Sequence, residues 1–195
     1  MWKQDLDYVP NQMKFVPMHK LKLSELGRMN LEEFKNSVKN EIVIVLDNIR
    51  SFHNTGSIFR SADAFRVKKI VLTGYTPTPP HREIRKTAIG AEESVEWQYE
   101  KEIVDAIHTL KKDGFSIVAV EQTSESIPLS EFTWKAGEKV ALIFGNEVEG
   151  VQESVIALCD KAVEIPQYGT KHSLNVSVAA GVVLYGMMEK ITFKE

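Results

Sequence analysis

Runs of apolar residues alternate with amphipathic segments along most of this chain. Five runs rich in Val, Ile, Leu and Ala predict buried strands at 42–47, 68–74, 115–120, 139–145 and 161–165. Apolar residues at helical spacing predict helices at 54–65, 101–114, 151–159 and 174–190. Strands that are apolar throughout and alternate with helices are typical of a parallel sheet with helices on both faces. The sequence therefore predicts an α/β fold.

The pattern changes near residue 40. Residues 1–40 lack the alternation of strand and helix and predict an arm that ends in a short helix, with Asn30 as its N-cap and Glu33 completing a capping box. The proline-rich stretch 76–80 predicts a loop. We therefore divide the chain into an arm at 1–40 and one domain at 41–195.

Composition narrows the class of protein. The chain has 195 residues, of which 43% are hydrophobic and 26% charged, as in ordinary globular proteins. Its single cysteine, Cys159, excludes an internal disulfide and is typical of a reducing compartment. The first residues show no signal-peptide pattern, and the longest apolar run, 176–188, is too short to span a bilayer. We expect a soluble, cytoplasmic protein with no membrane partner.

Charge is distributed unevenly. The whole chain carries a net charge of −3, but residues 50–90 contain eight basic and only two acidic residues, so this stretch is +6 and the rest is −9. A local basic excess favours a surface that binds phosphates. The alternative is a set of solvated charges around ordinary helices.

Polar segments follow three of the predicted strands. They are DNIRSFHNTGSIFRSADA from residue 47, GNEVEG from residue 145 and PQYGTKHSLN from residue 166. Ligands of open α/β sheets lie outside the carboxyl ends of the strands, so these segments are the candidate site.

Several common chemistries do not fit these segments. GNEVEGVQ lacks the Lys-Ser/Thr pair of a phosphate-binding loop, and the chain has no G-x-G-x-x-G and no G-x-S-x-G that would make Ser173 a hydrolase nucleophile. The five histidines are scattered and have no metal-ligand spacing with Cys159. We therefore expect neither a metal site nor nucleotide hydrolysis.

Each polar residue also has a purely structural interpretation. Asn54 is a candidate N-cap of its helix, and Ser173 or Asn175 of the last helix, because such side chains satisfy free backbone N–H groups. Arg60 is compatible with an exposed helical arginine, and Glu147 with a solvated loop. No single residue distinguishes these interpretations from a functional one.

The three segments together form a specific series of motifs. The chain carries N-x-G-x-x-x-R at 54–60, F-G-N-E-x-x-G at 144–150 and I-P-x-x-G-x-x-x-S-L-N-V-S-x-A at 165–179. This series resembles the three motifs of the SPOUT superfamily of RNA methyltransferases, in the SpoU/TrmH-type branch that acts on ribose 2′-hydroxyls. The resemblance covers residues 42–188.

The resemblance implies a fold detail, a cofactor and partners. It implies a deep trefoil knot near the C-terminus, which is an exception to the rule against threaded chains. The implied cofactor is S-adenosylmethionine, released as S-adenosylhomocysteine, without a metal. The implied partners are tRNA or rRNA, not DNA, and a second copy of the chain in a homodimer.

The resemblance also assigns the site residues. The implied catalytic and RNA-facing set is Asn54, Arg60, Glu147, Ser173 and Asn175. The implied cofactor cradle, together with the end of the strand at Glu121, is Gln122, Thr123, Phe144, Gly145, Asn146, Gly150, Ile165, Pro166, Gln167, Tyr168, Ser173 and Leu174.

Arg60 is the implied activator of the ribose hydroxyl. Because a guanidinium stays protonated, we expect Arg60 to clamp a backbone phosphate and lower the pKa of the hydroxyl, and not to act as a base. Asn54 would fix Arg60 or the ribose, Ser173 and Asn175 would hold the sugar-phosphate, and Glu147 would orient this network.

The final helix is the expected dimer contact, because its largely apolar surface is hard to cover within one copy. Dimerisation would let Asn54 and Arg60 act across the interface. Small residues, among them Ala180 and Gly186, would admit a close neighbour, and we expect Val183→Glu to give an inactive monomer or aggregate.

Two substitutions depart from the superfamily pattern. Val148 stands where a glycine is frequent, so the backbone there must have an ordinary φ or be strained, and Phe52 stands where proline is common. Many relatives carry a separate N-terminal RNA-binding domain, whereas we expect only the forty-residue arm here, which leaves the RNA substrate open. Two alternative functions remain: a non-catalytic knotted RNA-binding module, and methylation of a base by the same fold.

Overall fold

The computed structural model describes residues 18–192. Of these, residues 18–30 belong to a small unit of their own, which contains the 3-10 helix η1 (Leu23–Glu25). The larger unit starts with α1 (Leu31–Asn36), whose Phe34 is buried in the hydrophobic core. The predicted cap at Asn30 falls at this boundary and stays a prediction.

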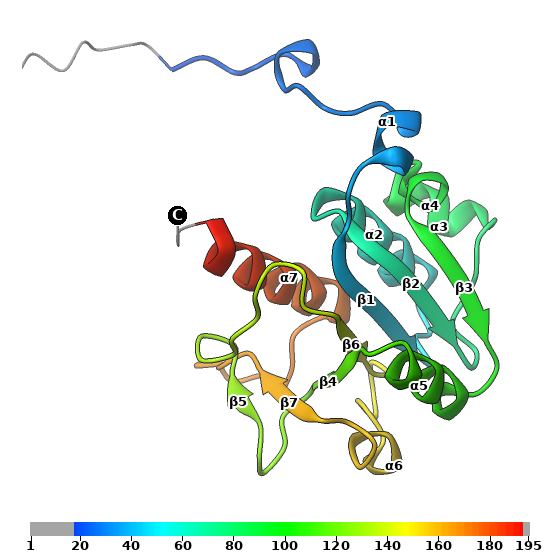
Figure 1. Ribbon diagram of the computed structural model, residues 1–195, viewed down its shortest axis with the longest axis vertical. Helices are drawn as coiled ribbons and strands as arrows, with labels where there is room; N and C mark the ends of the chain where they lie inside the picture. The colour runs from blue at the N-terminus through cyan, green and yellow to red at the C-terminus, as the bar shows by residue number, and fades with distance from the viewer. Residues whose placement is uncertain (1–17, 193–195) are drawn as a thin grey trace, which may run out of the picture. The chain divides into compact units, whose positions relative to one another are not determined.

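A seven-stranded sheet forms the centre of the larger unit. The strand order is β3-β2-β1-β6-β4-β7-β5, and each strand is parallel to its neighbours (Figure 1). The strands are β1 (Asn40–Asp47), β2 (Val67–Thr73), β3 (Glu96–Glu100), β4 (Ser116–Val120), β5 (Ile127–Pro128), β6 (Val140–Phe144) and β7 (Lys161–Glu164). This order places β1, β6, β4 and β7 side by side in the sheet.

Helices cover both faces of the sheet. Alternate residues of a strand point to opposite faces, so β1 directs Ile44 and Leu46 to one side and Val43 and Val45 to the other. The first side packs against α2, α3 and α7, and the second against α5 and α6 (Figure 1). The helices are α2 (Phe52–Ala64), α3 (Arg82–Ala88), α4 (Ala91–Ser94), α5 (Ile103–Lys112), α6 (Glu153–Ile156) and α7 (Val176–Thr192). The predicted α/β class is confirmed.

The predicted strands and helices are confirmed with small shifts in their ends. The helix predicted over 151–159 is shorter, because α6 spans four residues of which only Val155 is buried. The elements α3, α4, β3 and β5 were not predicted. Strand β3 is the polar stretch EWQYE at the edge of the sheet, and none of its residues is fully buried.

The final helix, α7, has one buried face and one exposed face. Gly186 lies close to Leu129 of the same chain, because an added Cβ would lie 3.0 Å from Leu129 Cδ2. Val183 is only 1% exposed and packs in the core of its own chain, so a dimer contact through α7 would have to use other residues and stays a prediction. The exposed apolar stripe of α7 consists of Val178, Val182 and Tyr185.

Cys159 follows α6 and packs against the core on that side of the sheet. Its Sγ donates to the carbonyl oxygen of Val155 at 3.3 Å. Burial, reinforced by the neighbouring Asp160, raises the pKa of the Cys159 thiol to about 11. The thiol is therefore protonated at neutral pH.

Residues 18–192 contain neither a membrane-spanning helix nor a cluster of candidate metal ligands. Within that range, no helix is both long enough and apolar enough to cross a membrane. In the same range, no three His, Cys, Asp or Glu side chains are grouped as a metal ion would require.

Candidate active site

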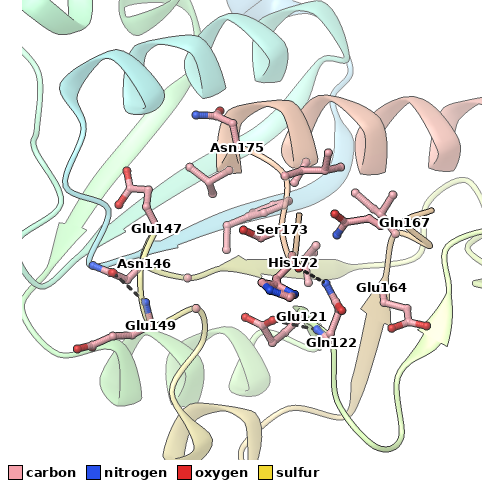
Figure 2. A pocket seen from close by; sticks show the side chains of 18 of the residues that line it. Glu121, Gln122, Asn146, Glu147, Glu149, Glu164, Gln167, His172, Ser173 and Asn175 are labelled. Carbon is pink, nitrogen blue, oxygen red and sulfur yellow. Dashed lines mark hydrogen bonds between the residues drawn. The ribbon is translucent and has the colours of Figure 1, made fainter. Parts of the chain in front are cut away.

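A cavity of about 480 Å³ lies at the carboxyl ends of β4, β6 and β7. Its walls come from the segments that follow these strands and from the start of α7. Figure 2 shows Glu121, Gln122, His172 and Ser173 gathered in this cavity, with Asn175 at the beginning of α7. The sheet thus brings together two of the three polar segments selected from the sequence, and the third lies beside them.

Most of the predicted cofactor set lines the cavity. The lining members are Gln122, Phe144, Gly145, Asn146, Gly150, Ile165, Gln167, Ser173 and Leu174. Thr123, Pro166 and Tyr168 are outside the lining, and Tyr168 is 97% exposed. The lining also contains residues that sequence reasoning did not assign to the cofactor: Val120, Glu149, Val163, Glu164, His172, Val176 and Ala179.

The loop after β6 is folded tightly on itself. Asn146 and Gly150 exchange two backbone hydrogen bonds of 3.1 and 2.8 Å. A Cβ on Gly145 would lie 2.2 Å from the carbonyl carbon of Gly150, so only glycine fits there. Val148 is not among the described non-glycine residues with positive φ, which confirms an ordinary backbone at that departure from the superfamily pattern.

The Asn146 side chain fixes this loop through both its amide oxygen and its amide nitrogen. Its Oδ1 accepts from the backbone N–H of Val148 at 2.8 Å and of Glu149 at 3.2 Å. Its Nδ2 donates to the carbonyl oxygen of Asn48 at 2.8 Å and to the Tyr75 hydroxyl at 2.6 Å. Asn146 therefore fixes the cavity loop to the ends of β1 and β2.

Glu121 supports the same loop from the end of β4. Its carboxylate accepts from the backbone N–H of Gln122 and of Val151, both at 2.9 Å. The Gln122 side chain in turn donates to the carbonyl oxygen of His172 at 2.9 Å. These bonds connect the segment after β4 to both of the other cavity segments.

A polar cluster at the rim joins all three motifs. The Asn54 amide donates to Glu147 Oε1 at 2.9 Å, and the Asn175 amide donates to Asn54 Oδ1 at 3.1 Å. Glu147 also accepts from the backbone N–H of Arg50 at 3.0 Å and of Ser51 at 3.2 Å. The chain thus contacts itself across 93 and 121 residues at this point.

Glu147 is an ionised acceptor in this cluster. Partial burial raises the pKa of its carboxyl, but the backbone N–H of Arg50, the Asn54 amide and further backbone N–H groups outweigh burial and lower the pKa below its ordinary value. A carboxylate that already accepts from several donors is a weak base. The cluster is therefore suited to hold polar groups in place.

The capping interpretation is wrong for Asn54 and correct for Asn175. Ser51 is the N-cap of α2, and its Oγ accepts from the backbone N–H of Asn54 at 3.2 Å, so the Asn54 side chain is left for the cluster. Asn175 Oδ1 accepts from the backbone N–H of Ser177 at 2.9 Å at the start of α7. Asn175 therefore caps α7 while its amide nitrogen reaches the cluster.

Arg60 does not reach this cavity within one chain. It is exposed and lines a separate hollow with Ser57, Phe65 and Lys86. Six residues along a helix correspond to a rotation of about 240° beyond a full turn and a rise of about 9 Å, so Arg60 and Asn54 lie on different sides of α2. The structure does not show the expected contact between them.

The basic excess of residues 50–90 is partly paired with carboxylates. Lys68 contacts Glu41 at 2.7 Å, and Lys86 contacts Glu83 at 2.7 Å. The side chains of Lys86 and His53 lower the pKa of the Glu83 carboxyl to about 2, so Glu83 is fully ionised near neutral pH. The surface available for phosphates is therefore smaller than the count of charges suggests.

Comparisons with known proteins agree with this geometry. Residues 41–185 match the model of the SpoU rRNA Methylase family. The chain is 32% identical over 161 residues to the tRNA (guanosine(18)-2′-O)-methyltransferase of Aquifex aeolicus, covering 80% of this chain and 72% of that protein. It is 30% identical over 159 residues to a 23S rRNA (guanosine-2′-O-)-methyltransferase of Neisseria meningitidis, covering 81% and 62%.

Solved structures give the same result. The A. aeolicus TrmH/SpoU tRNA modifying enzyme has a TM-score of 0.71 at 29% identity, with 80% of this chain and 78% of that chain covered. An AdoMet-bound rRNA methyltransferase of Sinorhizobium meliloti has a TM-score of 0.72 at 26% identity, with 78% and 57% covered. With the three motifs joined at the rim of one cavity and a family model matching residues 41–185, this chain belongs to the SpoU rRNA methylase family.

Proposed function

We propose that this protein transfers a methyl group from S-adenosylmethionine to a ribose 2′-hydroxyl of RNA. The observation that carries the proposal is the cavity between the three strand ends, with the Asn54–Glu147–Asn175 cluster at its rim. Relatives that match most of this chain are named as ribose methyltransferases of tRNA and of rRNA. The RNA is tRNA or rRNA by this argument.

The cavity is large enough for the cofactor. Its volume of about 480 Å³ is within the range of small-molecule sites. Because Gly145 has no Cβ, the backbone of Gly150 packs closely against it, and this compact loop forms one wall of the cavity. Residues 144–150, 165–167 and Leu174 would hold the cofactor, with Glu121 and Gln122 behind them. When bound, the sulfonium supplies an activated methyl group.

The residues of this chain mainly have to position the ribose. Orientation of two reactants contributes up to about 7–11 kcal/mol to catalysis. Asn54, Asn175 and Ser173 are placed to hold the sugar and its phosphate at the rim, and Glu147 keeps both asparagines oriented. Because Glu147 is an ionised, saturated acceptor, we assign it to orientation and not to proton abstraction.

The arginine and the dimer belong to the same proposal. Arg60 clamps a backbone phosphate beside the target ribose, and it comes from the second copy of the chain, because in its own chain it faces a different hollow. The exposed stripe of Val178, Val182 and Tyr185 supports a dimer contact through α7. The site is then complete only in the homodimer.

The knot is also part of the proposal. The segment between β4 and β6 would form a loop, and the segment after β7 would pass through this loop. Supporting contacts are the Gln122–His172 bond and the Lys190 ammonium, which donates to the carbonyl oxygens of Leu129 at 2.5 Å and Phe132 at 2.6 Å. An experimental structure in which the segment after β7 lies outside this loop would contradict the threading.

One experiment tests the activity directly. RNA from cells that lack the protein is incubated with the purified protein and S-adenosylmethionine labelled in its methyl group, and 2′-O-methylated positions are mapped. We expect one position, or a small set, to gain a ribose methyl. Labelled base and unlabelled ribose would favour base methylation, and folded protein that binds neither cofactor nor product would favour the non-catalytic module.

A further inference from the structure

Phe52 is an exposed aromatic residue at the first position of a helix. Ser51 is the N-cap of α2, so Phe52 occupies the position where proline is favoured, because its fixed φ suits the helix start. Phenylalanine has no such advantage, and its side chain is 37% exposed instead of joining the core. Helix formation and core packing therefore do not explain this residue.

The ring of Phe52 is stacked on His81. The two ring centroids are 4.0 Å apart and the rings are inclined by 29°. His81 is held in turn at the start of α3, because its Nδ1 accepts from the backbone N–H of Glu83 at 3.2 Å. Both residues are exposed. Two rings from different helices thus form one aromatic pair at the surface.

The pair stands on a rigid base. A Cβ on Gly56 would lie 2.2 Å from Thr87 Oγ1 and 2.3 Å from the carbonyl oxygen of Ile84, so α2 and α3 are in direct contact. Thr87 Oγ1 also donates to the carbonyl oxygen of His53 at 3.0 Å. The two rings are therefore already held in place before a ligand binds, and this reduces the conformational entropy lost on binding.

The surroundings of the pair suit a nucleic acid. The exposed Arg50 and Arg82 flank it in the sequence; the Arg82 side chain is 83% exposed and its Nε contacts Glu83 at 3.0 Å. Phe52 lies in the same first turn of α2 as Asn54, the rim residue that contacts Glu147 and Asn175, about 3 Å away along the helix axis but on another side of the helix. Aromatic rings between cations near a ribose-binding cluster are the features of a base-stacking subsite.

From this arrangement we infer that Phe52 and His81 form a platform on which one base of the RNA substrate stacks, where the RNA strand passes the start of α2. Stacking is tolerant of sequence, because every base has a π face. Arg82 contacts a phosphate of the same strand. This inference rests on the proposed function and adds the way in which the RNA strand is held at the site.

Substitutions at Phe52 distinguish the effect of ring stacking from the effect of having an apolar side chain at this position. Phe52→Leu keeps an apolar side chain but removes the ring, and Phe52→Trp keeps a ring. The full-length proteins are titrated into fluorescein-labelled single-stranded oligoadenylate of about 12 nucleotides, a length that matches typical single-strand sites, and anisotropy is measured. We expect Phe52→Leu to weaken binding about 5- to 100-fold and Phe52→Trp to stay within about threefold of wild type.

Salt dependence and cofactor affinity provide the controls. The logarithm of the binding constant falls linearly with the logarithm of the salt concentration, because phosphate contacts release counterions. Phe52→Leu should leave the slope of this line unchanged. Arg82→Gln should make the slope shallower by about one, because it removes one phosphate contact. S-adenosylmethionine affinity, measured by calorimetry, should not change in any of the three variants. A reduced cofactor affinity in Phe52→Leu would instead indicate a structural role and overturn the platform.

The remaining outcomes are also decisive. If Phe52→Leu binds oligoadenylate as tightly as wild type while wild-type protein methylates RNA, the platform is wrong and the proposed function stands. If wild-type protein binds the oligonucleotide but methylates no RNA, the proposed function fails independently of the platform.

Discussion

The side-chain amide of Asn54 donates a 2.9 Å hydrogen bond to Glu147, although 93 residues separate them in the sequence. Asn54 lies in the first turn of α2 and Glu147 in the loop after β6. This contact ties the rim that would hold the ribose to the loop that would hold the cofactor. It is the relationship on which the proposed catalysis most depends.

Glu147→Gln tests that contact. Glutamine keeps the shape but replaces the carboxylate that accepts hydrogen bonds from Arg50, Ser51 and Asn54. We therefore expect turnover to fall about tenfold or more, in line with the strength of hydrogen bonds to charged groups.

The pKa of Glu147 is lowered, so wild-type turnover should show no titration of this group above pH 5. Rates of methyl transfer from pH 5 to 9 measure both effects. A turnover proportional to ionisation of a group near pH 7 that disappears in Glu147→Gln would show that Glu147 is the base.

Gly145→Ala tests the cofactor loop. The new methyl would meet the backbone of Gly150 at 2.2 Å, so the loop must move, and we expect S-adenosylmethionine affinity to fall at least about tenfold. Gly169→Ala is the matched control, because an added Cβ there meets no atom within 4 Å and its φ is not positive. Calorimetric titration compares the two variants, and equal affinities would mean that the 145–150 loop does not hold the cofactor.

Mixed dimers test the origin of Arg60. We expect the rate of methyl transfer to fall about 100-fold or more in Arg60→Ala and in Asn175→Ala, because both groups position the reacting atoms. If Arg60 acts in the partner's site, a heterodimer of the two variants contains one complete site and regains activity. Subunits are unfolded and refolded together, and methyl transfer is compared with each variant refolded alone. If Arg60 acts in its own chain, the mixture stays inactive.

Two neighbouring residues of α7 separate dimerisation from folding. Val182 is 38% exposed and Val183 is 1% exposed. Val182→Glu should give a folded monomer that binds RNA but does not methylate it. Val183→Glu buries an unpaired charge and should fail to fold, with a cost of several kcal/mol. Light scattering and circular dichroism distinguish these outcomes, and an active monomer of either wild type or Val182→Glu would contradict the proposed dimer.

The buried Asp47 carboxyl should make the stability of the folded protein depend on pH. Burial raises the pKa of its carboxyl above the ordinary value despite hydrogen bonds from Thr73 and Asn48, and the side chain is 2% exposed. A carboxyl with a raised folded-state pKa contributes stability below its unfolded pKa and loses it as pH rises through the folded pKa. Asp47→Asn cannot ionise, so we expect its melting temperature at pH 7 to exceed that of wild type by about 2 °C or more. This advantage should shrink toward pH 4 in thermal melts, and a constant difference at all pH values would contradict the explanation.

The fold was largely predictable from the sequence, and the reasons are visible in particular elements. Strand β1 reads NEIVIVLD, and six of its eight residues are buried, so its apolar run identifies it. Strand β3 reads EWQYE and lies at an edge with no buried residue, so no run marks it. Helix α3 was missed because it buries only Ile84 and Ala88, which is too little for a periodic signal.

The site was predictable only in part, for a different reason. Glycines and polar residues after strands indicated where the cavity lies. The role of Tyr75 depends on a hydrogen bond to Asn146, 71 residues away, and that of Asn48 on a contact across 98 residues. Periodicity describes one segment at a time and does not contain such pairings. The placement of Arg60 on another side of α2 follows from helix geometry, but the motif alone does not express it.

The single, partly buried cysteine makes this protein convenient for thiol labelling. A thiol with a pKa of about 11 reacts slowly with maleimides at neutral pH, because the thiolate is the nucleophile. A new cysteine at an exposed position, such as Tyr168→Cys, would therefore take a fluorophore selectively without prior removal of Cys159. The arrival of RNA or cofactor at the neighbouring cavity can then be followed in real time on an otherwise unmodified chain.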